Sequence, residues 1–318
     1  MILDENFSYG YDGGLFNLRA SSESNFECHY NKSKRNFKSL REEAKVVCEK
    51  ISDYCRSIKK IPVVLLSGGL DSEVVVRSFI DSGREFKAVS NRFLQDLNIH
   101  EIDYIERLKK KFNFDHTYVD IDIVKFYGSQ RCKDLIDISK CTKPEMIPTM
   151  ELIHYVYNHM DGIPVLGNGD FYVSKDNEDG KIVWNYYEYE YILAWMRFCV
   201  DQDITAATNF FQYTPEIVLS VGRDSIMSDL FAKSPEEKKS SRSKKYIVYK
   251  KNWIDIELRQ KFHGCENIMS ICDELRNTIC LSNSHYTDIW KMPVDNFLSM
   301  IETYSITESQ SINFSSSS

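Results

Sequence analysis

None of the nine cysteines in this sequence are paired as CxxC, and their odd number does not suit a disulfide framework. The last three, Cys265, Cys272 and Cys280, are also spaced too widely for a usual zinc site. No apolar run reaches the length of a membrane-spanning helix, and Asp4 and Glu5 stand where a signal peptide would be basic or apolar. These absences predict a cytoplasmic protein with reduced thiols and no membrane partner.

A strong positive charge is also missing. The formal net charge is −7 and the isoelectric point is near 5.6, which argues against a general nucleic-acid binder. The 318 residues suffice for one large domain or two small ones, and with 42% hydrophobic and 13% aromatic residues a sizeable core is available. We therefore expect a globular protein that acts on small molecules rather than on nucleic acid.

One stretch, Pro62–Arg77, combines three signals for phosphate binding. The apolar run Pro62–Leu66 shows no alternation, which is typical of a strand buried on both faces of a parallel sheet. SGGLDS follows it, and apolar residues then recur at helical spacing. The glycines allow close backbone approach, so the loop amides and the helix N-terminus can converge on an anion. A carboxylate in such a cradle needs a cation between itself and the phosphates, so we expect Asp71 to hold Mg²⁺.

This loop lacks the GKS or GKT ending of a Walker P-loop. SGGLDS instead resembles the PP-loop of the ATP pyrophosphatases, a superfamily that cleaves ATP to AMP and pyrophosphate. The resemblance implies that the chain binds ATP and Mg²⁺. Contacts to ATP are then expected from Leu66, Ser67, Gly68, Gly69, Leu70, Asp71 and Ser72.

Strand and helix patterns alternate over the first half of the chain. Helices are predicted at Leu40–Ile58, Ile99–Phe112 and Glu145–Met160, and strands at Phe86–Ser90, around Val119, Ile121 and Ile123, and at Pro164–Leu166. Such alternation predicts an α/β fold with a parallel sheet and flanking helices, in which ligands bind at the carboxyl ends of the strands. Another helix is predicted at Ile268–Ile279, within a mostly helical C-terminal part.

Three stretches are similar to the synthetase domain of asparagine and β-lactam synthetases. Glu101, Tyr104 and His116 stand where that family has an acidic residue, a tyrosine and a histidine. VLGNGD at residues 165–170 resembles its glycine loop, and RQKFHG at residues 259–264 resembles its lysine-bearing segment. The resemblance implies an adenine-nucleotide α-hydrolase-like fold. It also implies ATP contacts from Gly167, Asn168 and Gly169, a second Mg²⁺ ligand at Asp170 and a catalytic lysine at Lys261.

The sequence also departs from that family. Asp170 follows Gly169 directly, without the usual intervening residue, and Asn168 replaces the usual glutamate. The family's glutaminase domain, which opens with a cysteine nucleophile after the initiator Met, has no counterpart, since Ile2 follows Met1. We therefore expect ammonia or a substrate amine to be the nucleophile, unless a separate glutaminase supplies the nitrogen.

The aromatic stretch Trp184–Trp195 has two interpretations. It fits a buried helix, because Tyr187, Tyr191 and Trp195 recur every four residues. It also fits a pocket wall. By resemblance to the β-lactam-forming relatives, one of its two glutamates would then deprotonate the attacking amine, and the candidates are Glu188 and Glu190.

The basic run Lys233–Lys251 also has two interpretations. As a charge run it fits a solvated surface. Alternatively it closes over the triphosphate, with Lys244 or Lys245 as the phosphate partner.

The chain is expected to comprise an N-terminal arm or hairpin (1–39), a synthetase domain (40–306) and a disordered serine-rich tail (307–318). The favoured function is an AMP- and pyrophosphate-forming ligase that adenylates a small carboxylate for attack by ammonia or an amine. Two alternatives are a PP-loop enzyme that modifies a nucleobase or tRNA, and a non-catalytic nucleotide-binding protein.

Overall fold

A four-stranded parallel sheet forms the centre of the computed structural model, which describes residues 1–302 except 17–18, 22, 179–180, 233–241 and 260–264. The strands are β4 (Ile61–Leu65), β5 (Lys87–Phe93), β6 (His116–Ile121) and β7 (Gly162–Val165). Their order in the sheet is β6-β5-β4-β7, and every pair is parallel. The predicted α/β class with a parallel sheet is confirmed.

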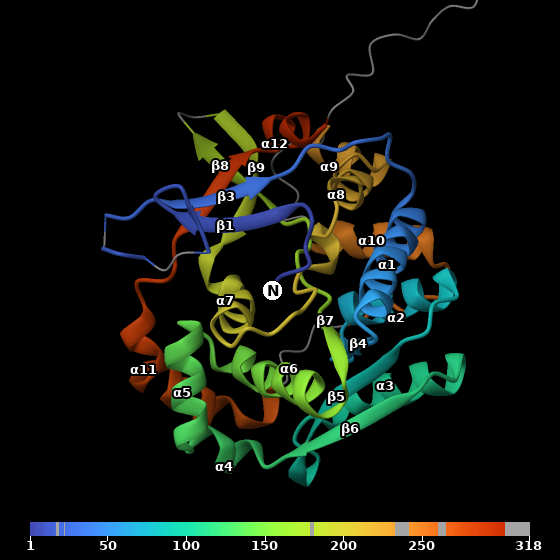
Figure 1. Cartoon of the computed structure of the whole chain (residues 1–318). Helices are drawn as coiled ribbons and strands as arrows, with labels where there is room; N and C mark the ends of the chain where they lie inside the picture. Colours follow the sequence, from blue (N-terminus) through green and yellow to red (C-terminus); the bar gives the residue numbers. More distant parts are fainter. Residues whose placement is uncertain (17–18, 22, 179–180, 233–241, 260–264, 303–318) are drawn as a thin grey trace, which may run out of the picture.

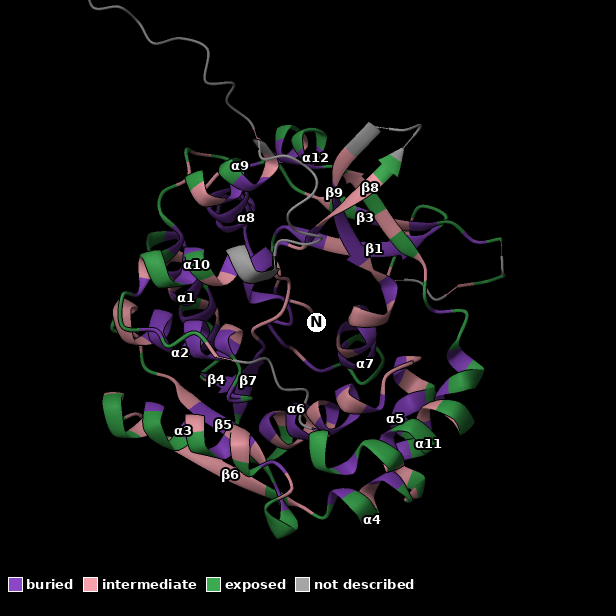
Figure 2. Ribbon diagram, turned by 180° about the vertical axis from the view of Figure 1, so that it is seen from behind, coloured by how far each residue is buried: buried purple, intermediate pink, exposed green. Residues whose placement is uncertain are grey.

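Helices cover both faces of this sheet (Figure 1). They are α1 (Leu40–Ser57), α2 (Leu70–Ser82), α3 (Ile99–Phe112) and α6 (Ile147–His159). Val64 and Ala88 pack in one core cluster with residues of α1, α2 and α3, whereas Val63 and Val89 pack in another with residues of α6. Both faces of β4 are therefore buried, which is why its sequence shows no alternation. Figure 2 shows these buried faces turned toward the sheet.

The N-terminal segment, for which the sequence predicted an arm or a hairpin, contains a small antiparallel sheet. It consists of β1 (Phe7–Tyr11), β2 (Gly14–Leu15) and β3 (Phe26–Tyr30) in the order β2-β1-β3. The chain before it is held to the body, because the Leu3 amide donates to the Ala206 carbonyl at 2.9 Å. Ala207 in turn bridges Val165 at the free edge of β7.

A third sheet lies where the sequence favoured a helix. It comprises β8 (Val173–Glu178), β9 (Lys181–Tyr189) and β10 (Ile289–Pro293), antiparallel in the order β10-β9-β8. The helix predicted for Trp184–Trp195 is therefore wrong over its first half. Only after β9 does the chain turn helical, through η3 (Glu190–Leu193) into α7 (Ala194–Asp201). A spacing of four residues also fits alternation with period two, and tyrosine and tryptophan favour strands.

The remaining elements are mostly helical. They are α4 (Ile123–Tyr127), α5 (Gln130–Ser139), η2 (Pro144–Met146), α8 (Pro215–Gly222), α9 (Ser225–Ala232), α10 (Arg242–Asn252), α11 (Met269–Thr278) and α12 (Val294–Ile301). The third strand ends at Ile121, so including Ile123 in it was wrong: Asp122 caps α4 by accepting from the Lys125 amide.

Two observations bear on the absences in the sequence. All nine cysteines are buried and none forms a disulfide. No helix within the described residues is both long and apolar enough to cross a membrane. The tail at 307–318 lies outside the described residues.

Candidate functional site

The SGGLDS loop links the end of β4 to the start of α2. Gly68 has φ +73, and a β-carbon there would lie 2.6 Å from the Glu101 carbonyl oxygen, so only glycine fits. The Ser72 hydroxyl donates to the Gly69 carbonyl at 3.1 Å and lies 3.1 Å from the Ser67 hydroxyl. No side chain of the described residues caps α2. Its first amides are therefore available to an anion.

A second glycine loop, Gly167–Asp170, leaves β7 beside the first. The two loops touch, since a β-carbon on Gly167 would lie 3.1 Å from the backbone of Asp71 and Ser72. β5 and β6 lie on one side of β4 and β7 on the other, so the loops meet where the strand order reverses. Ligands of open α/β sheets bind at such a switch point. The structure thus brings together the two loops that the sequence singled out.

A buried lysine lies between the two predicted metal ligands. The Lys245 Nζ, on α10, is 2.9 Å from Asp71 Oδ1 and 2.8 Å from Asp170 Oδ2, and its side chain is only 2% exposed. Tyr249, one turn later, donates its hydroxyl to Asp71 Oδ1 at 2.7 Å. Burial alone would lower the pKa of Lys245, but the two carboxylates raise it above its ordinary value.

This acidic pair suits Mg²⁺. Asp71 and Asp170 each direct an oxygen toward one positive charge, and Mg²⁺ is usually held by one or two carboxylates with substrate phosphates. Within the described residues there is no group of three or more metal-binding side chains, so an all-protein metal cage does not form there. Both aspartates fit a cation shared with a bound triphosphate, as the resemblance implied.

Arg259 clamps the first loop, a role that the sequence did not reveal. Its Nε and Nη2 donate to the Gly68 carbonyl at 3.1 and 2.7 Å, and its Nη1 donates to Glu73. The guanidinium also lies 4.3 Å from the centre of the Tyr104 ring. The RQKFHG resemblance had drawn attention to Lys261, which lies outside the described residues, so its role remains a prediction.

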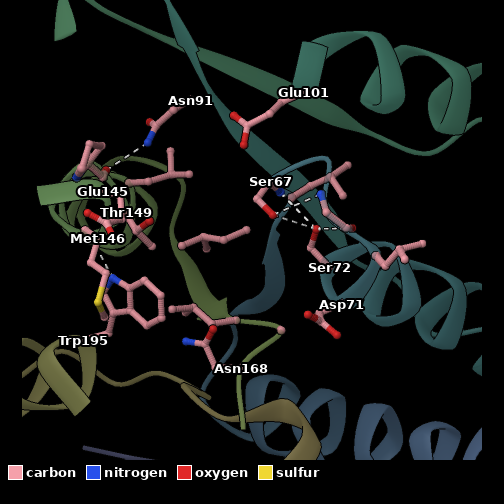
Figure 3. Close-up of a pocket in the computed structure, with 18 of the residues that line it drawn as sticks. Ser67, Asp71, Ser72, Asn91, Glu101, Glu145, Met146, Thr149, Asn168 and Trp195 are labelled. Carbon is pink, nitrogen blue, oxygen red and sulfur yellow. Dashed lines mark hydrogen bonds between the residues drawn. The ribbon is translucent and has the colours of Figure 1, made fainter. Parts of the chain in front are cut away.

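A cavity of about 400 Å³ opens in front of both loops. Figure 3 shows Ser67, Asp71 and Ser72 on one side of it, facing Met146 and Trp195 on the other. The Trp195 ring is fixed there, because its Nε1 donates to the Met146 carbonyl at 2.9 Å.

Three polar side chains complete this cavity. Asn91 Oδ1 and Asn168 Nδ2 are buried without a hydrogen-bonding partner in the described part of the chain, and both residues line the cavity. Burial raises the pKa of Glu101, which also lines it, to about 7. His116, which the resemblance to asparagine synthetases grouped with Glu101 and Tyr104, is not among the residues that line the cavity. Its Nε2 lies 2.8 Å from the Ser90 hydroxyl.

The two candidate glutamates differ in position. Glu188 lines a smaller cavity of about 210 Å³, where burial raises its pKa to about 7 despite hydrogen bonds that lower it. Glu190 is fully buried, pairs with Arg197 at 3.0 Å and accepts from the Asp288 amide, and it is not among the residues that line either cavity. The geometry supports Glu188 as the candidate for chemistry and gives Glu190 a structural role. The side chain of Lys244 lies outside the description.

Comparison with known proteins finds similarity in the first part of the site. The family described as "Queuosine biosynthesis protein QueC" matches residues 61–154. Curated 7-cyano-7-deazaguanine synthases of Rickettsia rickettsii (strain Sheila Smith) and Rickettsia massiliae (strain Mtu5) are each 33% identical over 100 residues. This match covers 31% of this chain and 43% of each relative, so the chain spans less than half the length of the relatives it matches.

Solved structures show a distant likeness. An NMN synthetase from Francisella tularensis aligns with 78% of this chain at 16% identity and a TM-score of 0.35. An NH3-dependent NAD synthetase from Campylobacter jejuni aligns with 78% at 13% identity and a TM-score of 0.37. These scores are too low to group the chain with either enzyme. The segment that carries SGGLDS is thus similar to QueC, whereas the finer resemblance to asparagine synthetases finds no support in these comparisons.

Proposed function

We propose that this chain is an ATP-dependent enzyme that forms AMP and pyrophosphate while activating an oxygen on a nucleobase-type substrate for attack by nitrogen. The observation that carries the proposal is the cavity of about 400 Å³. It joins the phosphate-binding loop to an aromatic wall at Trp195 and to two buried amide atoms, Asn91 Oδ1 and Asn168 Nδ2, that have no hydrogen-bonding partner among the described residues. A flat heterocycle with hydrogen-bonding edges suits such a wall better than a small aliphatic acid does.

The loop residues would bind the triphosphate. The free amides at the start of α2, with the Ser67 and Ser72 hydroxyls, would hold the pyrophosphate part. Asp71 and Asp170 would hold Mg²⁺, which neutralises charge on the leaving pyrophosphate. Lys245 adds a fixed positive charge at the same point. Adenylation needs no side-chain nucleophile, so these residues act by orientation and charge.

The name of the relatives suggests the substrate class. The carbon of a cyano group on a 7-deazaguanine can come from a carboxyl carbon that loses both of its oxygens. The first oxygen leaves as part of AMP. The substrate proposed here is therefore a 7-deazaguanine with a carboxyl group at position 7. Asn91 Oδ1 can accept from a ring N–H, and Asn168 Nδ2 can donate to a ring nitrogen or carbonyl.

This proposal replaces the small-carboxylate ligase as the favoured function, because the similar relatives act on a nucleobase. It keeps the reaction type, adenylation of a carboxylate oxygen followed by nitrogen attack. If the nucleophile is ammonia, a separate glutaminase would supply it.

The test is product chromatography with the purified chain, ATP, Mg²⁺ and either 7-carboxy-7-deazaguanine or aspartate. We expect AMP and pyrophosphate, with the deazaguanine at least tenfold faster than aspartate. Asp71→Asn should lower the rate by two orders of magnitude or more, because it removes a charge facing Mg²⁺.

Asp103→Asn is the control, since Asp103 is an exposed residue of α3. It should retain the wild-type rate. ADP as the main product, or an unchanged rate in Asp71→Asn, would falsify the proposal.

A further inference from the structure

A second, smaller cavity adjoins the first. Its volume is about 210 Å³, and it shares Gly169, Asp170, Tyr191 and Ile192 with the main cavity. All residues that line it fall outside the segment 61–154 that matches the QueC family. It is therefore built by the part of the chain for which the family match offers no function.

Tyrosines form one wall of this second cavity. They are Tyr172, Tyr187, Tyr189 and Tyr191. Their rings contact one another: Tyr187 and Tyr189 stack at 5.8 Å, and Tyr189 lies 5.7 Å from Tyr172 and 5.5 Å from Tyr191. Aromatic ring faces attract positive charge, and the Tyr191 ring already has Lys143 Nζ 3.6 Å from its centre.

Apart from the tyrosines, the ionisable side chains that line the cavity are two carboxyl groups, one of which, Asp170, pairs with Lys245. Asp170 and Glu188 line it, whereas no Lys or Arg occurs among the described residues that do. Tyr30, Tyr186 and Gln212 all donate to Oε1 of Glu188, the first at 2.8 Å. The other oxygen, Oε2, accepts no hydrogen bond from the described residues. Carboxylates beside aromatic faces suit a cation and reject a phosphate.

Asn209 supplies an independent sign of a ligand. It lines the cavity, the residue is only 4% exposed, and its Nδ2 has no hydrogen-bonding partner among the residues that the structure describes. Buried amide donors are normally satisfied, because an unpaired one costs about 1–3 kcal/mol. A ligand with an acceptor atom next to its positive charge would satisfy it.

We propose that this second cavity binds the primary amine of an organic molecule, and that this amine, rather than ammonia, attacks the adenylated substrate. A cavity of about 210 Å³ is many times the space that one ammonium ion needs. The shared border at Asp170 and Tyr191 opens it toward the reaction site. The attack on the adenylate rests on the proposed function. The binding of the amine in the second cavity does not depend on it.

In the first step of the proposed reaction, the ammonium group of the bound amine loses one proton to Oε2 of Glu188. Its nitrogen then bonds to the carboxyl carbon, and the bond from that carbon to the AMP oxygen breaks, with the electron pair leaving on AMP. The nitrogen loses a second proton to water, which leaves an amide. The amide nitrogen keeps its bond to the carbon of the attacking amine. The product is therefore a substituted amide, and the reaction does not continue to a nitrile.

The test measures amine binding without ATP, by saturation-transfer NMR titration with methylammonium, butylammonium and butan-1-ol. We expect butylammonium to bind at least tenfold more tightly than either of the others, because only it offers both a charge and an apolar stem. Glu188→Gln should weaken butylammonium at least tenfold while keeping the side-chain size. Tyr189→Leu, at a half-buried position that tolerates change, should weaken it several-fold.

The matched controls are Glu257→Gln and Tyr155→Leu. Glu257 is an exposed carboxylate 3.8 Å from Arg107, and Tyr155 pairs with His159 on α6, so neither lines the cavity. Both should bind butylammonium like the wild type. Equal binding of butan-1-ol and butylammonium, or no effect of Glu188→Gln, would overturn the inference.

The two proposals fail separately. If butylammonium binds as expected but no pyrophosphate forms with any deazaguanine acid, the proposed function is wrong and the amine site stands. If pyrophosphate forms and ammonium supports product formation as well as butylamine does, the amine inference is wrong.

Discussion

The two neighbouring cavities hold their carboxylates in opposite ways. At the glycine loops, Asp71 and Asp170 lie against the buried ammonium of Lys245. In the tyrosine-lined cavity, hydroxyl and amide groups donate to Glu188, no cation of the described residues pairs with it, and burial raises its pKa to about 7. The first environment places carboxylates against a positive charge, whereas the second raises the pKa of its carboxyl into the range of general acid–base chemistry. The partners of each carboxyl, and not its residue type, decide which role it can serve.

Lys245→Met should show the largest effect on stability. The change keeps the volume but leaves two partly buried carboxylates facing each other, so we expect a loss of about 3 kcal/mol in the free energy of unfolding. Mg²⁺ should restore part of this loss, because it can take the place of the ammonium between Asp71 and Asp170. Urea unfolding with and without Mg²⁺ measures both effects.

The control is Lys251, an exposed lysine of the same helix α10, which lies 2.8 Å from Asp224. Lys251→Met should cost less than about 1 kcal/mol and should not respond to Mg²⁺. If Mg²⁺ leaves Lys245→Met unchanged, the two aspartates do not form a metal site.

Gly68→Ala should have the next largest effect. A β-carbon would lie 2.6 Å from the Glu101 carbonyl oxygen, at a residue with φ +73, so we expect a loss of about 2 kcal/mol and a sharp fall in pyrophosphate formation. Gly83 has φ +64 but open space around it, so Gly83→Ala should cost about 1 kcal/mol and keep activity. Equal losses in the two variants would show that backbone strain alone, not the close approach to Glu101, makes glycine necessary.

Glu188→Gln should have the smallest effect on stability, visible as a change in pH dependence. The folded-state pKa of about 7 lies above the ordinary value of 4.5, so between these values the unfolded chain has released a proton that the folded chain keeps. Stability from this group is therefore present at low pH and is lost as the pH rises toward 7, by about 1.4 kcal/mol per pH unit. Relative to the glutamine variant, the wild type should lose this amount between pH 5.5 and 6.5 in urea unfolding.

The surface variant Glu257→Gln serves again as the reference, since it should change stability equally at both pH values. Parallel pH profiles of the wild type and Glu188→Gln would show that Glu188 is ionised in the folded state. The contrast between the two cavities would then disappear.

Much of the first cavity could be predicted from the sequence because phosphate binding uses consecutive residues. A strand, two glycines and a helix start lie within Ile61–Ser82, and their local conformations follow from residue types alone. The pairing of this loop with Gly167–Asp170 also followed, since parallel strands bring their carboxyl ends to one edge of the sheet. Arg259 and Tyr249 escaped notice, because they contact residues almost two hundred positions earlier and no local pattern marks them.

The sequence by itself determined the α/β class and the meeting of the two glycine loops, through local propensity and the geometry of parallel strands, whereas the metal role of Asp170 was implied by a family resemblance. Only the tertiary structure decided that Trp184–Tyr189 is a strand, because β10, its partner, lies about a hundred residues later in the chain. It also distinguished Glu188 from Glu190, two residues apart, by placing one on a cavity and the other against Arg197. Burial and ion pairing depend on contacts between distant segments, and a one-dimensional pattern of residue types does not contain them.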